Sequence, residues 1–124
     1  MKIALFIGLG GFAGSIARYY FSKINLIPAL SVIPFGTLLV NIAGSFLLGL
    51  LTGIADKTVL LSVEWRMFLM VGFCGGFTTF STFAGENLLL MRNANFHSMF
   101  IYTGLSVFLA FLFVYLGYNL TKIL

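Results

Sequence analysis

A run of glycine, hydroxyl and aromatic residues at positions 72–83 is the part of the sequence best suited to binding an ion. It reads Gly72-Phe73-Cys74-Gly75-Gly76-Phe77-Thr78-Thr79-Phe80-Ser81-Thr82-Phe83. Glycine in a helix interior costs ~1 kcal/mol relative to alanine, and threonine is also unfavourable there. We therefore expect a helix through this run to break.

In lipid, the backbone groups freed by such a break are tolerated only where they are buried in protein, line a cavity or bind an ion. Freed carbonyls suit a hard cation such as sodium, whereas amide ends favour an anion. The alternative is a distorted helix whose Ser and Thr side chains bond back to their own carbonyls.

Two further features could contact an anion. Phe80 and Phe83 are three residues apart and would share a helix face, where the positive edge of each ring can hold a small anion. Asn41 carries amide donors within a long apolar segment, and Thr37 lies one turn earlier on the same face. The alternatives are packing for the phenylalanines and a helix–helix hydrogen bond for Asn41.

The composition indicates which elements must position these residues. Of the 124 residues, 60% are hydrophobic and only 8% are charged, against about a quarter charged in soluble domains. The formal net charge of +4 comes from scattered residues, so no nucleic-acid-binding stripe is predicted. Four apolar segments of roughly 20 residues, the length that spans a bilayer, lie at about 3–21, 34–54, 66–91 and 96–120.

The sequence thus predicts an all-α membrane protein of four transmembrane helices, with the third broken mid-membrane. A short connection containing Pro28 separates the first two segments, and residues 1–124 form one domain. We expect the first segment to be retained and not cleaved as a signal peptide, since cleavage would leave only three helices. Cys74 is the only cysteine, so it cannot form an internal disulfide.

The charged residues show almost no bias between the two sides of the predicted bundle. One side carries Lys2, Lys57, Arg66 and Lys122, and the other carries Arg18, Lys23 and Arg92. The positive-inside rule needs a clear asymmetry. The near balance favours either insertion in both orientations, with opposite copies forming an antiparallel dimer, or a fixed topology set by the first helix.

Glycines recur at the spacing typical of close helix contacts, in the pairs Gly10 and Gly14, Gly49 and Gly53, and Gly72 and Gly76. These faces could serve oligomerisation or packing within one subunit, and the spacing alone leaves both open.

Three motifs point to a known family: residues 75–83, the run Gly36-Thr37-Leu38-Leu39-Val40-Asn41 and the Gly-x-x-x-Arg from Gly14 to Arg18. With these motifs, the whole chain resembles the CrcB/Fluc family of fluoride channels. The resemblance implies a fluoride-selective channel of the bacterial inner membrane, which lowers cytoplasmic fluoride toxicity by passive efflux. It also implies an antiparallel, dual-topology homodimer with two pores.

The resemblance carries particular roles onto this chain. It places pore residues at Asn41, Phe80 and Phe83, and a vestibule residue at Arg18. It places a sodium ion at the dimer centre, held by the backbone carbonyls of Gly75 and Thr78. Further polar lining is implied at Tyr102, Ser106, Ser81, Thr82, Thr37 and Glu86. Relatives often carry a hydroxyl where this chain has Ala110, and Glu86 could instead be a residue near the membrane surface.

Two other functions remain open from the residues. One is a proton-coupled exporter of the small multidrug-resistance type, which needs a carboxylate in the first helix, where this chain has none. The other is a non-transporting membrane assembly subunit. An enzyme is not expected, because His97 is the only histidine and no constellation of nucleophile and base or of metal ligands is found.

Overall fold

The computed structural model describes residues 1–23, 32–59 and 61–123. Within these ranges, 4 helical spans are long and apolar enough to cross a membrane: Lys2–Phe21, Phe35–Lys57, Val63–Arg92 and Phe96–Ile123. The predicted all-helical architecture is confirmed, with span ends close to those expected from the apolar pattern. The connection predicted around Pro28 lies outside the described residues.

The third span is made of several helical pieces. It comprises α3 (Val63–Arg66), the wider π-type helix η2 (Met67–Cys74), α4 (Gly75–Phe77) and α5 (Phe80–Arg92). Between α4 and α5, Thr78 (φ −82°, ψ 154°) and Thr79 (φ −151°, ψ 124°) are extended. The predicted break is therefore present, but it follows the glycine pair and does not coincide with it, since Gly75 keeps helical angles (φ −64°, ψ −39°).

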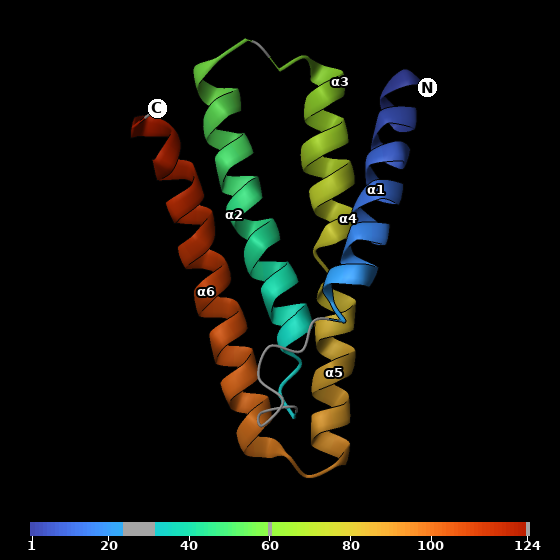
Figure 1. Cartoon of the computed structure of the whole chain (residues 1–124), viewed down its shortest axis with the longest axis vertical. Coiled ribbons are helices and arrows are strands. Elements are labelled where there is room, and N and C mark those ends of the chain that lie inside the picture. The colour runs from blue at the N-terminus through green and yellow to red at the C-terminus, as the bar shows by residue number, and fades with distance from the viewer. Residues whose placement is uncertain (24–31, 60, 124) are drawn as a thin grey trace.

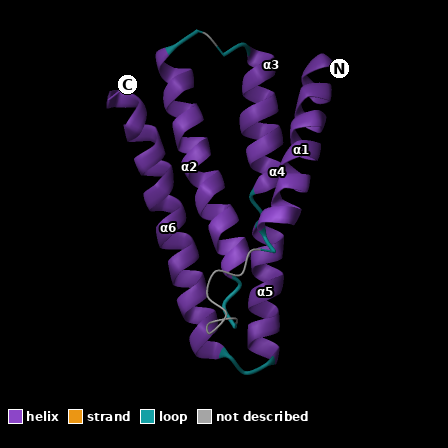
Figure 2. Ribbon diagram, in the orientation of Figure 1, coloured by secondary structure: helices purple, strands orange, loops and turns teal. Residues whose placement is uncertain are grey.

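The helices pack as two pairs. The first pair is α1 (Lys2–Phe21) with the η2 and α4 pieces of the third span, and the second is α2 (Phe35–Lys57) with α6 (Phe96–Ile123). The two pairs diverge toward the end of the molecule that holds both termini and converge around α5 (Figures 1 and 2). The region of the break therefore lies where the two pairs meet.

The glycine faces are used inside the subunit. A Cβ added at Gly10 or Gly14 would overlap the backbone carbonyl of Phe68 or Phe73, and one at Gly49 would overlap the carbonyl of Val114. Gly53 lies against the Thr121 side chain, and Gly72 and Gly76 lie against the backbone of α1. These pairs therefore join α1 to the third span and α2 to α6.

A small buried cluster fixes α2, α5 and α6 where the two pairs converge. It consists of Leu38, Leu90 and the fully buried Tyr102, with Phe83 among the residues packed on it. Most other large apolar side chains of the described residues face outward, including Phe12, Phe100 and Phe108. Such a surface suits lipid as the surrounding solvent.

Candidate functional site

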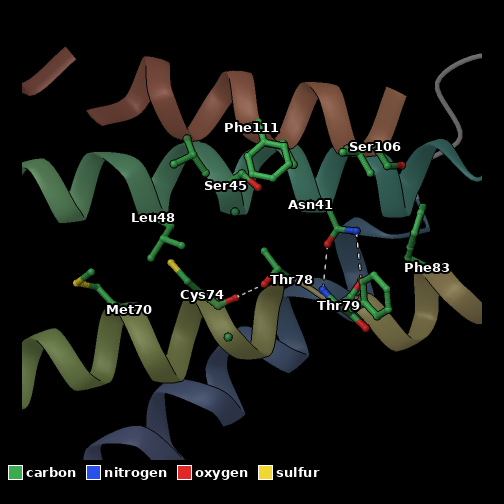
Figure 3. Close-up of a pocket in the computed structure, with 16 residues that line it drawn as sticks. Asn41, Ser45, Leu48, Met70, Cys74, Thr78, Thr79, Phe83, Ser106 and Phe111 are labelled. Atoms are coloured by element: carbon green, nitrogen blue, oxygen red, sulfur yellow. Dashed lines mark hydrogen bonds between the residues drawn. The ribbon is translucent and has the colours of Figure 1, made fainter. Parts of the chain in front are cut away.

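Asn41 bridges α2 to the broken segment. Its Oδ1 accepts a hydrogen bond from the Thr79 backbone N–H at 3.0 Å, and its Nδ2 donates to the Thr79 carbonyl at 3.3 Å (Figure 3). The break takes the Thr79 N–H away from its helical acceptor, the Gly75 carbonyl, and an unpaired N–H is costly away from water. One side chain thus bonds both backbone groups of a single extended residue.

Arg18 supports the break from the opposite side. Its Nε donates to the Gly76 carbonyl at 3.0 Å, across 58 residues of sequence. In an unbroken helix this carbonyl would accept from Phe80 N–H, four residues on, but Phe80 starts the next helix. Arg18 is half-buried and turned into the protein, which leaves Lys23 and Arg92 as the cations facing outward at its end of the bundle.

Thr78 and Thr79 shape the two helix ends at the break. The Thr78 N–H and Oγ1–H both donate to the Cys74 carbonyl, at 2.9 Å and 2.7 Å. The Thr79 Oγ1 accepts from Thr82 N–H at 3.2 Å and so caps the start of α5. These local bonds explain why the chain extends at this threonine pair.

The same geometry releases carbonyls that could bind a cation. Thr79 N–H, the usual helical donor to the Gly75 carbonyl, is directed to Asn41. Gly75 is exposed, and a Cβ added there would meet nothing within 4 Å. The Gly75 and Thr78 carbonyls therefore belong to the kind of hard oxygen ligand that a sodium ion requires.

A row of aromatic rings begins at the break. The ring centroids of Phe80 and Phe83 are 5.7 Å apart, and those of Phe83 and Tyr102 are 5.1 Å apart. Tyr102 is fully buried, whereas Phe80 is 79% exposed in the isolated chain. The row thus runs from the buried Tyr102 on α6 to the exposed ring of Phe80 on α5.

Tyr102, the buried end of this row, also belongs to a hydrogen-bonded cluster with Thr37 and Glu86. Thr37 Oγ1 donates to Glu86 Oε1 at 2.6 Å, and the Tyr102 hydroxyl donates to Glu86 Oε2 at 3.1 Å. Both carboxylate oxygens of Glu86 are thus engaged by hydroxyl groups from α2 and α6. Glu86 also borders a second hollow, together with Asn93 and Asn95 at the α5–α6 turn.

A groove of about 450 Å³ runs between the two helix pairs and passes the break. Most of its lining is apolar, as the Leu48, Met70 and Phe111 side chains in Figure 3 show. Its polar lining comes from Asn41, Ser45, Thr78, Thr79 and Ser106. Ser106 Oγ is buried and has no hydrogen-bond partner within the described part of the chain.

The groove brings together six of the residues singled out in the sequence: Asn41, Gly75, Thr78, Phe80, Phe83 and Ser106. Thr37, Glu86 and Tyr102 form the adjoining cluster, and Arg18 contacts the break from α1. Ser81 and Thr82 lie on α5 outside the groove lining, and Ser81 is exposed. The roles predicted for all these residues remain predictions.

Sequence reasoning gave Thr79 no role, although its backbone is the anchor of Asn41. Threonine is a favoured residue just before a helix, and Thr79 acts in this way, because its Oγ1 accepts from Thr82 N–H at the start of α5. It also assigned nothing to Ser45, which lines the groove on α2.

The sequence is similar to one family model and to many curated proteins. The model described as "CrcB-like protein, Camphor Resistance (CrcB)" matches residues 5–118. Three relatives are named "Fluoride-specific ion channel FluC". The protein of Chlorobium chlorochromatii is 43% identical over 91% of this chain and 87% of its own length. That of Pyrococcus abyssi is 41% identical over 98% of both chains. That of Vibrio vulnificus is 38% identical over 94% of this chain and 93% of its own.

Proposed function

The chain belongs to the CrcB family, and on this premise we propose that it is a fluoride-selective channel that lets fluoride leave the cytoplasm passively. The single observation that carries the proposal is the groove at the helix break, where Asn41, Phe80, Phe83 and Ser106 meet. The chain is a multi-pass membrane protein, and we propose the bacterial inner membrane as its location. We propose no enzymatic activity.

The lining of the groove has a physical logic for this ion. Fluoride is small and strongly hydrated, so a narrow route must replace its lost water with closely placed donors. The second amide hydrogen of Asn41, the hydroxyl of Ser106 and the positive edges of Phe80 and Phe83 could supply such contacts without a fixed positive charge. Conduction requires binding that is strong enough for entry and weak enough for release, and neutral donors meet both needs.

We propose that the functional unit is an antiparallel homodimer of oppositely inserted copies. The exposed ring of Phe80 and the open, largely apolar groove support a partner that covers this face. The glycine faces do not offer such an interface, because they are occupied within the subunit.

We also propose that a sodium ion binds at the centre of this dimer, where it would hold the two copies together. The Gly75 and Thr78 carbonyls fit this role, since Gly75 lacks its usual helical donor and has open space beside it. Hard cations take several oxygen ligands. Two carbonyls from one chain are too few, so the site requires those of a second copy.

The decisive experiment is ion efflux from liposomes that contain only this purified protein. A potassium ionophore removes the opposing voltage, and fluoride and chloride electrodes follow release. We expect fast fluoride release without matching chloride release. No fluoride release from well-folded protein would overturn the proposal.

The same assay separates the two other candidate functions. A proton-coupled exporter would need a proton gradient and a carboxylate in α1, and α1 contains no Asp or Glu. A non-transporting assembly subunit would release neither ion. Rapid electrogenic fluoride flux without a proton gradient would exclude both.

A further inference from the structure

Ser45 lines the groove but takes part neither in the hydrogen bonds at the helix break nor in the fluoride contacts proposed above. It lies on α2 four residues after Asn41, and both residues line the groove. Residues four apart on a helix share a face. Figure 3 shows Ser45 on the same wall of the groove as Asn41.

The hydroxyl of Ser45 is not used by its own helix. Ser and Thr within helices often donate to the carbonyl four residues earlier. Thr52, on the same helix, does so to the Leu48 carbonyl at 2.8 Å. Ser45 makes no such bond to protein groups in residues 1–23, 32–59 and 61–123. Its proton is therefore available to an occupant of the groove.

The other donors of the groove are few. Asn41 gives one of its two amide hydrogens to the Thr79 carbonyl and keeps one. Ser106, on α6, has a buried hydroxyl that finds no partner among the residues that the structure describes. One turn further along α6 the groove is lined by Ala110, which carries only a methyl group. On the α2 wall of the groove, Ser45 therefore supplies the side-chain hydroxyl between Asn41 and the end near Leu48 and Met70.

We propose that Ser45 donates a hydrogen bond to fluoride and extends the series of donors from Asn41 toward the end of the groove near Leu48 and Met70. One helical turn, about 5.4 Å, separates Ser45 from Asn41, so an ion leaving one donor meets the next without crossing a purely apolar stretch. This inference rests on the proposed channel function. It assigns this part of the route to α2, because α6 carries Ala110 there and offers no side-chain donor.

The test compares Ser45→Ala with the matched control Thr52→Val in the liposome assay, at equal protein density. Thr52→Val removes a hydroxyl from the same helix, at a position outside the groove lining. We expect Ser45→Ala to lower fluoride efflux about tenfold, the size expected for a lost hydrogen bond to a charged group, and Thr52→Val to stay within about twofold of wild type. Elution volume and melting temperature check that both variants are folded.

A rescue experiment separates donation from packing. Adding Ala110→Ser to Ser45→Ala returns a hydroxyl to the same groove from α6, and we expect it to restore most of the lost flux. If Ser45→Ala does not fold, Ser45→Cys, which keeps the size and weakens the donor, takes its place. Unchanged flux in the single variant, an equal loss in Thr52→Val or a failed rescue would each overturn the inference. A wild-type protein without flux would instead refute the proposed channel function.

Discussion

The side chain of Asn41 pairs with both backbone groups of Thr79, accepting from its N–H at 3.0 Å and donating to its carbonyl at 3.3 Å. The two residues are 38 positions apart in the chain. This pairing fastens α2 to the point where the third span is interrupted. Asn41 therefore has a structural role in addition to the anion contact proposed for its remaining amide hydrogen.

Replacing Asn41 by aspartate tests the structural role and the proposed anion contact together. Asn41→Asp removes the donor to the Thr79 carbonyl and places a negative charge beside the anion route. We expect fluoride efflux to fall by at least about tenfold. The control Asn119→Asp changes an amide that bonds the Tyr115 carbonyl on the exposed end of α6, and it should conduct normally. Wild-type conductance in folded Asn41→Asp would remove Asn41 from the route.

The aromatic row can be tested at its exposed member. Phe80→Ile keeps an apolar side chain but removes the ring whose positive edge would face an anion. We expect a clear loss of fluoride flux from a protein that still folds and elutes as the wild type does. Phe100→Ile, at an exposed site on α6 outside the groove, is the control. If purified Phe80→Ile conducts normally, the pore assignment is wrong.

A stability measurement can show whether Arg18 supports the helix break or is only a surface cation. Arg18→Met leaves the half-buried Gly76 carbonyl without its donor, which costs about 1 kcal/mol, the lower end of the range for a fully buried group. We expect a lower melting temperature in detergent and faster amide exchange around the break. Arg92→Gln removes an exposed cation from the same end of the bundle and should change neither. Equal behaviour of the two variants would contradict the contact between Arg18 and the break.

The close packing of α2 on α6 predicts a steep response to added volume. In Gly117→Val, the new side chain would overlap the Phe46 carbonyl, and rigid backbone cannot yield cheaply. We expect destabilisation of about 1–3 kcal/mol or more, measured as a lower melting temperature. At Gly104 a Cβ meets nothing within 4 Å, so Gly104→Ala should be neutral or slightly stabilising by helix propensity. A tolerated Gly117→Val would show that the pair is less closely packed than described.

The sequence predicted the elements and the presence of a break because both depend on local chemistry. Apolar segments of bilayer length specify membrane helices whatever their neighbours are. The glycine and threonine content of residues 72–83 lowers helix propensity locally. The position of the break was less accessible, since Gly75 remains helical and the chain extends at Thr78 and Thr79. There the Asn41 pairing and the Thr79 cap compensate the lost helical bonds.

The glycine pairs show a different limit. Their spacing predicts close helix contact but does not identify the partner, since a second copy and another helix of the same chain need the same small residues. The structure assigns Gly10 and Gly14 to the third span, and Gly49 to α6.

By itself, then, the sequence determined the solvent of this protein, its helical spans and the residue types available to meet an ion. The tertiary structure decided which of them meet. Arg18 reaches Gly76 across 58 residues, and Glu86 receives hydroxyl donors from Thr37 and Tyr102 on two other helices. Such contacts depend on how helix pairs are rotated and tilted against each other. That geometry is set by the sum of packing over whole helix faces, which no local pattern contains.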